Sequence, residues 1–207
     1  MRIVCQKRFS RRCLLARHNP AIGSNISTII PKKISIEVAE HTIVLGEVSK
    51  NTFNILSKMP CVIYHKTDDI YGSVYILPPI KYPEGRIWIK IGQSRGYVMN
   101  QPEKNLIPWF QGKGDTEISK WLHQELFNIL PDTKLLSTKT ASCVTTKSKS
   151  GFQFIDKFRD TEIYCCLVGD GQAAKSADEI GRIAAHRVLY GNVPKEYSEV
   201  NFQIQYL

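Results

Sequence analysis

The stretch Val168-Gly169-Asp170-Gly171-Gln172-Ala173-Ala174-Lys175 decides how this chain is expected to fold. It ends a nearly continuous apolar run, 161–168, of the kind that a strand buried on both faces shows. A helix is expected to follow from Ala173 to Tyr190, with Gly191 as its C-terminal stop. Such a strand–turn–helix unit gathers backbone N–H groups and the positive end of a helix dipole at one point. That point suits an anion or an electron-rich carbonyl group.

The pattern Gly169-x-Gly171-x-x-Ala174 also has the spacing of a dinucleotide fingerprint. Two observations argue against that interpretation. The few dozen residues after the pattern cannot complete a doubly wound half. About twenty residues on, where an acidic residue should hold the ribose, the chain reads Leu189-Tyr190-Gly191.

The expected helix is lined with small residues, and Gly181 lies in its middle at a cost of about 1 kcal/mol relative to Ala. Close approach to a backbone or a flat ligand would explain this glycine. Tight packing of the helix on the sheet would explain it equally well. The small residues are Ala173, Ala174, Ala177, Gly181, Ala184 and Ala185.

Upstream, the pattern predicts strands and one helix. Residues 86–92 alternate, with Ile87, Ile89 and Ile91 on one face and Lys90 on the other. A helix is predicted over 116–130, with Asp115 as its N-cap and Pro131 at its end. Further strands are predicted near 135–146 and 152–155, and 200–207 could add an edge strand.

The net charge of +9 is concentrated at the N-terminus. Residues 1–36 carry eight basic residues and no acid, and the first acid is Glu37. A basic tail on a nearly neutral body argues against a nucleic-acid-binding domain, which would carry its charge on a folded face. Segment 1–33 is therefore expected to be a basic, disordered extension. Its composition is also that of a mitochondrial transit peptide, so both interpretations stay open.

The six cysteines and five histidines predict no metal site. The cysteines form no Cys-x-x-Cys pair, and no histidine lies at zinc-ligand spacing from them. No stretch is apolar for long enough to span a bilayer, and no secretory signal is recognisable. The chain is therefore expected to be intracellular, either cytoplasmic or mitochondrial, with reduced thiols.

Three motifs in order carry a resemblance: Cys143-Val144-Thr145-Thr146, Phe154-Ile155-Asp156, and the glycine motif followed by Gly181. Together they resemble the C-terminal portion of the sarcosine-oxidase-like, FAD-dependent amine oxidoreductases of the D-amino-acid-oxidase superfamily. The resemblance covers roughly residues 34–192. That family opens with a Gly-x-Gly-x-x-Gly strand–turn–helix and has an arginine that shares the substrate carboxylate. Neither has a counterpart in this chain.

The resemblance implies an α+β or α/β fold in four segments. Residues 1–33 are the extension, and 34–150 form a substrate-domain-like mixed β-sheet with a packed helix. Residues 151–192 form the C-terminal strand–turn–helix of an FAD-binding domain whose N-terminal half is missing, and 193–207 are a tail.

FAD is the cofactor that the resemblance implies. In that family a strand lysine holds a water near flavin N5 and promotes reaction with oxygen, and a lysine at the helix start binds the substrate carboxylate. Lys90 and Lys175 match these positions and are the candidate catalytic residues. Cys143 stands where some members attach FAD covalently, and a plain buried thiol is the alternative. The implied cofactor-binding residues are Cys143, Gly169, Asp170, Gly171, Gln172, Ala173 and Ala174.

The chain also departs from the family's pattern. The aromatic or histidine residues often found around the second glycine are replaced by Asp170, Gln172 and Ala173. The substrate pocket is therefore expected to differ in detail from that of sarcosine oxidase.

Two functions of different classes follow. The first is FAD-dependent oxidation of the C–N bond of a primary or secondary amine or amino acid, with oxygen as the acceptor. The second is a truncated, non-catalytic chain unable to hold FAD alone, or a subunit that needs a second chain with the N-terminal FAD-binding half. The expected partners are a small amine and that second chain, with no nucleic acid and no membrane.

Overall fold

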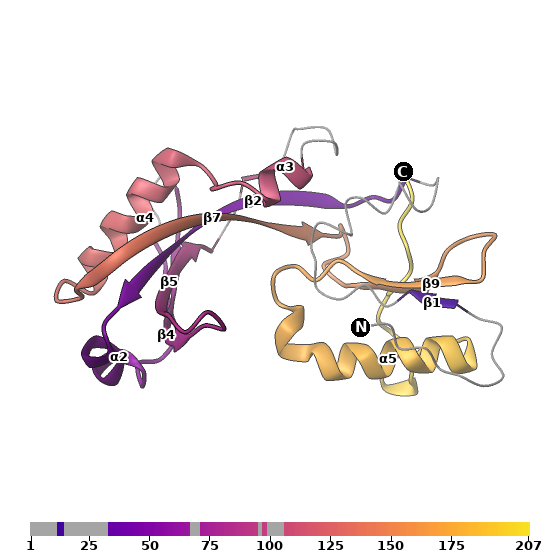
Figure 1. The fold of residues 1–207 in the computed structure, drawn as a ribbon. Helices are drawn as coiled ribbons and strands as arrows, with labels where there is room; N and C mark the ends of the chain where they lie inside the picture. The colour runs from indigo at the N-terminus through magenta and orange to yellow at the C-terminus, as the bar shows by residue number, and fades with distance from the viewer. Residues whose placement is uncertain (1–11, 15–32, 67–70, 95–96, 99–105) are drawn as a thin grey trace. The chain divides into compact units, whose positions relative to one another are not determined.

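The computed structural model describes residues 12–14, 33–66, 71–94, 97–98 and 106–207 (Figure 1). They form two compact units. The large-sheet unit is Ala39–Val144, and the small-sheet unit combines residues up to Val38 with Thr145–Leu207. The sequence placed a boundary at residue 150, whereas the division falls inside a strand, after Val144.

The large-sheet unit contains β2 (Glu37–Val48), β3 (Val62–Tyr64), β4 (Val74–Lys81), β5 (Ile87–Gln93), β6 (Tyr97–Val98) and β7 (Leu135–Lys147). The order in its six-stranded sheet is β3-β4-β5-β2-β6, and β7 pairs with β2. A mixed sheet was expected, but the pairs with a described register are antiparallel. Short connections such as 82–86 explain this, because parallel neighbours need a crossover of a dozen or more residues.

Strand β4 contains a β-bulge beside the β5 lysine. Leu77 pairs with Lys90, but the next pair is Ile80 with Trp88, so β4 has one extra residue in this interval. Pro78 and Pro79 occupy the interval. Proline lacks a backbone N–H for the strand ladder, which confines it to bulges and strand edges.

Three helices belong to the large-sheet unit: α2 (Lys50–Leu56), α3 (Leu106–Phe110) and α4 (Thr116–Ile129). The sequence predicted α4 and its N-cap, and the structure confirms both. The Asp115 side chain accepts a hydrogen bond from the Ile118 backbone N–H at 2.9 Å. The sequence did not predict α2 and α3.

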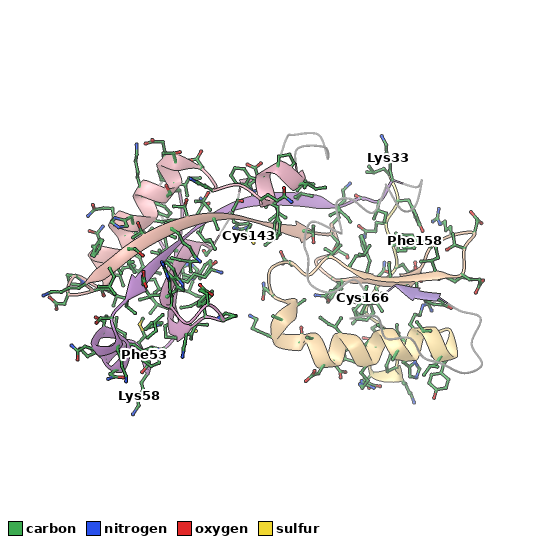
Figure 2. All side chains as sticks on the ribbon, in the orientation of Figure 1. Lys33, Phe53, Lys58, Cys143, Phe158 and Cys166 are labelled. Carbon is green, nitrogen blue, oxygen red and sulfur yellow. The ribbon has the colours of Figure 1, made fainter. Side chains whose placement is uncertain are left out.

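The core of this unit lies between α4 and one face of the sheet. The alternation predicted for β5 places Ile89 and Ile91 in this core, fully buried, opposite Leu122 and Leu126 of α4. Phe53 of α2 packs against the same cluster (Figure 2). The residues between them on β5 therefore belong to the other face of the sheet.

The small-sheet unit contains β1 (Arg12–Leu14), β8 (Phe154–Lys157) and β9 (Ile163–Leu167), in the order β1-β9-β8. Strand β9 pairs with β1 in parallel and with β8 antiparallel (Figure 1). Tyr164, Cys165 and Leu167 are buried, which confirms a strand covered on both faces. The expected disordered extension therefore includes a strand at Arg12–Leu14, whose backbone completes the edge of β9. The other residues of segment 1–32 lie outside the described residues.

Helix α5 (Ala177–Tyr190) covers one face of the small sheet through Ile183 and Ala184. Gly191 ends it in the left-handed conformation at φ 79°, as predicted. The tail contains a 3₁₀ turn, η4 (Lys195–Tyr197), and then buries Phe202 and Ile204. The edge strand expected over 200–207 is reduced to one bridge, Ile34 with Tyr206.

Across the described residues, every helix is too short or too polar to pass through a membrane.

Candidate functional site

The glycine turn of the small-sheet unit follows β9 directly and has unusual backbone angles. Val168, Asp170 and Gly171 have φ values of 68°, 47° and 65°. This left-handed region is unfavourable for a β-branched residue such as Val168, and strain of this kind clusters at ligand sites. A Cβ atom on Gly171 would also lie 3.1 Å from the Thr145 methyl carbon. A side chain at position 171 would therefore be strained, and glycine is favoured there.

The end of β7 holds this turn in place. The Asp170 backbone N–H donates to the Thr146 carbonyl at 3.0 Å, and Lys147 Nζ lies 3.6 Å from Asp170 Oδ1. The Gly169 carbonyl accepts from the backbone N–H groups of Gln172 and Ala173, at 2.9 and 3.0 Å. The turn thus uses these N–H groups internally.

The helix expected from Ala173 begins later. Residues 173–176 form a 3₁₀ turn, η3, and the α-helix starts at Ala177. Asp178 and Glu179 lie in its first turn, where acidic side chains complement the helix dipole. The positive end of the α-helix is therefore separated from the glycine turn by η3. The flavin-contact role of 169–174 stays a prediction.

Lys175 lies in η3 with an exposed side chain. Its Nζ donates to Gln172 Oε1 at a long 3.4 Å. A cation at the start of an α-helix would be disfavoured by the helix dipole, but the α-helix begins two residues after Lys175. The substrate-carboxylate role of Lys175 stays a prediction.

Gly181 does not have the tight packing that its place in the helix suggested. It is exposed, and among the described residues a Cβ atom built on it would meet no atom within 4 Å. Ala174, Ala177 and Ala185 are exposed as well. The buried members of the small-residue set are Ala173 and Ala184.

The large-sheet unit brings two of the sequence-predicted site residues together. Lys90 of β5 and Cys143 of β7 interact electrostatically, and Tyr75 of β4 interacts with both. Lys90 Nζ lies 5.4 Å from the centre of the Tyr75 ring, within the range of a cation–π contact. All three side chains are half-buried, and Figure 2 labels Cys143 on β7. The three residues are called the Lys90 cluster below.

In the Lys90 cluster, burial and the charge of Lys90 have opposite effects on the pKa values of Cys143 and Tyr75. Burial raises the pKa of the Cys143 thiol, and the Lys90 charge offsets part of that rise. Burial likewise raises the pKa of the Tyr75 hydroxyl, and the nearby charge of Lys90 offsets part of that rise. Within the described part of the chain, no carboxylate forms an ion pair with Lys90. The cluster therefore offers a cation beside two neutral groups, a composition that suits an electron-rich ligand.

Helix α3 fixes the strand segment that carries Cys143. The Trp109 indole Nε1 donates to the Cys143 carbonyl at 3.1 Å. The neighbouring Ser142 hydroxyl donates to the carbonyls of Trp109 and Gly112. The raised thiol pKa means that Cys143 is not an activated thiolate in this chain alone, since the thiolate is the nucleophilic form. Covalent attachment of a cofactor there stays a prediction.

Asp156, part of the second resemblance motif, has a structural role. Its Oδ1 accepts from Arg187 Nη2 of α5 at 2.7 Å, and its Oδ2 accepts from the Ile204 backbone N–H at 3.3 Å. One carboxylate thus ties β8 to the helix and to the tail. No group of three or more potential metal-ligating side chains occurs in the ranges that the structure describes.

Sequence reasoning missed Tyr75. Strand pairing is the signal that could have found it, because Tyr75 faces Gly92 across the β4–β5 pair, next to Lys90. A hairpin predicted between these strands would have placed a tyrosine beside the candidate lysine.

The sequence matches no family model and no curated protein. Solved structures do match. NikD, an unusual amino acid oxidase essential for nikkomycin biosynthesis, matches 93% of this chain with a TM-score of 0.63 and 15% identity. Fructosyl peptide oxidase from E. terrenum matches 87% of it with a TM-score of 0.59 and 13% identity. This chain spans 48% and 43% of those two chains. At such identity the likeness establishes the fold alone: a mixed α and β chain with the architecture of part of these oxidases.

Proposed function

We propose that this chain is part of an FAD-dependent oxidoreductase that oxidises the C–N bond of an amine or amino acid, with oxygen as the acceptor. Two kinds of support converge. The fold is like that of an amino acid oxidase and a fructosyl peptide oxidase. The sarcosine-oxidase-like resemblance expects a cation at Lys90, and the half-buried Lys90 beside the Tyr75 ring supports that role. The Lys90 cluster is the observation that carries the proposal.

FAD would accept two electrons from the C–N bond. The protein would orient the cofactor and tune its reactivity. Lys90 would lie at the flavin edge, where its ammonium stabilises negative charge that develops on oxygen. It fits this task because it is half-buried and forms no ion pair with a carboxylate among the described residues. A pre-placed cation in a water-poor site needs no reorganisation during the reaction.

The resemblance assigns two further roles to residues of the small-sheet unit, the substrate carboxylate to Lys175 and flavin contact to the glycine turn. Among the described residues, the exposed ammonium of Lys175 donates to one amide oxygen at 3.4 Å. A substrate carboxylate would replace it with a stronger, charge-assisted bond. Because Gly169 and Gly171 have no side chains, a flat ring could approach the backbone of this turn closely. Cys143 is the candidate for a covalent link and otherwise a half-buried thiol.

The whole activity needs more protein than this chain contains. The chain spans less than half the length of the oxidases that it matches. Among the described residues, the glycine turn at 169–171 is the one glycine motif that follows a strand, and it is already assigned to the flavin. No second motif of this kind is there to bind the pyrophosphate of FAD. We therefore propose that the adenosine half of the cofactor is held by a further segment or a second chain.

The test is an FAD titration of the purified chain, followed by visible absorption spectroscopy. Binding would shift the flavin band, and Lys90→Met would weaken or abolish the shift. Lys81→Met, an exposed lysine of β4, is the matched control and should leave it unchanged. Acid precipitation then separates the outcomes: colour in the precipitate means a covalent link. A wild-type chain with no band shift at saturating FAD would favour the non-catalytic or partner-dependent alternative.

A further inference from the structure

Tyr75 lies at the centre of a cross-strand row on the sheet face away from α4. Ile63 of β3 faces Tyr75, and Tyr75 faces Gly92 of β5. In the adjacent row, Leu77 faces Lys90. Residues directly opposite one another share a face of the sheet, and diagonal neighbours are within reach of long side chains. The register alone therefore brings the Tyr75 ring beside the Lys90 side chain.

Gly92 provides the space that the Tyr75 ring occupies. A Cβ atom on Gly92 would lie 2.6 Å from the Tyr75 hydroxyl oxygen and 2.7 and 2.9 Å from two ring carbons. No real side chain tolerates such distances, so the phenol lies across the glycine backbone. The absence of a side chain at position 92 therefore leaves room for the ring against the backbone of β5.

Lys90 depends on this ring for its place. Its ammonium lies 5.4 Å from the ring centre, and its charge acts on the hydroxyl group. A lysine is a point charge on a flexible stem, so a fixed position requires partners. In the described parts of the chain no carboxylate pairs with Lys90. The Tyr75 ring is its cation–π partner, and its charge also acts on the Cys143 thiol.

We propose that Tyr75 is a positioning residue: its phenol, seated on Gly92, holds the Lys90 ammonium at the Cys143 side of the sheet. The inference rests on the proposed function, because it gives that cation a fixed place for the reaction with oxygen. Tyr75 acts through Lys90.

Cys143 is a built-in reporter of where Lys90 lies. The titratable groups that face its thiol are Lys90 on β5 and Tyr75 on β4, and the nearby ammonium favours the thiolate. Below the thiol pKa, each unit of increase in that pKa lowers the thiolate fraction about tenfold. The rate of iodoacetamide alkylation at Cys143, followed by peptide mass spectrometry between pH 6 and 10, therefore measures the ammonium's proximity without any cofactor.

Three variants test the proposal. Lys90→Met should slow alkylation of Cys143 several-fold at pH values below the thiol pKa and move the pH–rate profile to higher pH. Tyr75→Phe keeps the ring and removes the hydroxyl, and Gly92→Ala keeps the hydroxyl and displaces the ring. Both should change the profile in the same direction by a smaller amount. Tyr64→Phe, the same substitution on neighbouring β3, should not change it.

Each outcome supports or overturns a named part of the proposal. An unchanged profile in Tyr75→Phe and Gly92→Ala, beside a changed one in Lys90→Met, would overturn the positioning role of Tyr75. An unchanged profile in Lys90→Met would overturn the geometry of the whole cluster. If Gly92→Ala does not fold, Tyr75→Phe alone carries the test. The proposed function fails separately: an FAD-loaded enzyme whose reaction with oxygen is unchanged in Lys90→Met would refute the role of Lys90 while leaving the alkylation result intact.

Discussion

Lys90 in the large-sheet unit and Lys175 in the small-sheet unit carry the same charge in opposite surroundings. Lys90 is half-buried beside an aromatic ring and a thiol, whereas Lys175 is exposed, with one long hydrogen bond to an amide. The first is held by a sheet whose register fixes its neighbours. Lys175 lies in a 3₁₀ turn, and its ammonium is accessible to a ligand. We therefore propose different roles for the two lysines: Lys90 would act as a pre-placed electrostatic group, and Lys175 as an adaptable binding group.

The largest expected effect separates these two lysines by kinetics. In an enzyme assembled with FAD, Lys90→Met should lower the rate of oxygen consumption about 10²- to 10³-fold, as loss of one preorganised stabilising group does. Lys175→Met should instead raise KM for a carboxylate-bearing amine and leave KM for an amine without a carboxylate unchanged. An oxygen electrode measures both. Equal effects of the two variants on both parameters would remove the distinction.

The second prediction concerns what holds the small-sheet unit together. Asp156→Ala should lower the free energy of unfolding by about 2 kcal/mol, somewhat below the cost of breaking a fully buried ion pair, because Arg187 and the Ile204 N–H lose their acceptor. Urea denaturation followed by circular dichroism measures it. Glu162→Ala breaks the exposed pair with Lys157 and should cost less than about 1 kcal/mol. A result in which Glu162→Ala costs as much would contradict the structural role of Asp156.

A third prediction contrasts two glycines. Gly92→Ala should destabilise the chain by about 1–3 kcal/mol, because the added methyl group collides with the Tyr75 ring. Gly181→Ala should stabilise it by about 1 kcal/mol, because the methyl group meets open space and alanine favours the helix. Thermal unfolding gives both signs. A destabilised Gly181→Ala would mean that a neighbour outside the described residues approaches α5.

The smallest effects come from two glutamates that respond oppositely to pH. Burial, with the nearby charge of Asp115, raises the pKa of Glu40, so its charged form is disfavoured in the fold. Glu40→Gln should therefore stabilise the chain at pH 7, and the gain should vanish as pH falls below the ordinary value of 4.5. The hydrogen bond from Arg182 lowers the pKa of Glu179 to about 2.

Glu179→Gln should accordingly destabilise the chain at pH 7, because it removes a favoured charge. That loss should shrink as pH falls from 4.5 to about 2, where the wild-type carboxyl is protonated. Unfolding temperatures of the two variants and the wild type at several pH values measure both. Parallel pH dependence in the two variants would contradict the opposite environments assigned to the two carboxyls.

Local signals in the sequence predicted much of the fold. The Asp115 cap, the stop at Gly191 and the buried strand β9 each depend on residues within one element or its flanks. The start of α5 was misplaced because the strained turn at 168–171 draws the following residues into a 3₁₀ turn. Helix periodicity does not report such a distortion.

The site was harder to predict, because its contacts join distant residues. Lys90 and Cys143 were expected to act, but their shared neighbour Tyr75 depends on how β4 and β5 pair. Asp156 was noted for its motif, whereas its partners Arg187 and Ile204 lie 31 and 48 positions away. Strand register and helix docking are tertiary outcomes, so composition and periodicity leave them open.

The bulge at Pro78 and Pro79 has an evolutionary consequence for the hairpin that carries Lys90. Before the bulge, Leu77 pairs with Lys90 in register with the rest of the sheet. After the bulge, from Ile80 to the tip of the hairpin, the pairing is shifted. Insertions or deletions in the tip can thus accumulate across generations without rotating Lys90 to the opposite face. The bulge thus separates the tip of the hairpin, whose length can change, from the strand pairing that places Lys90.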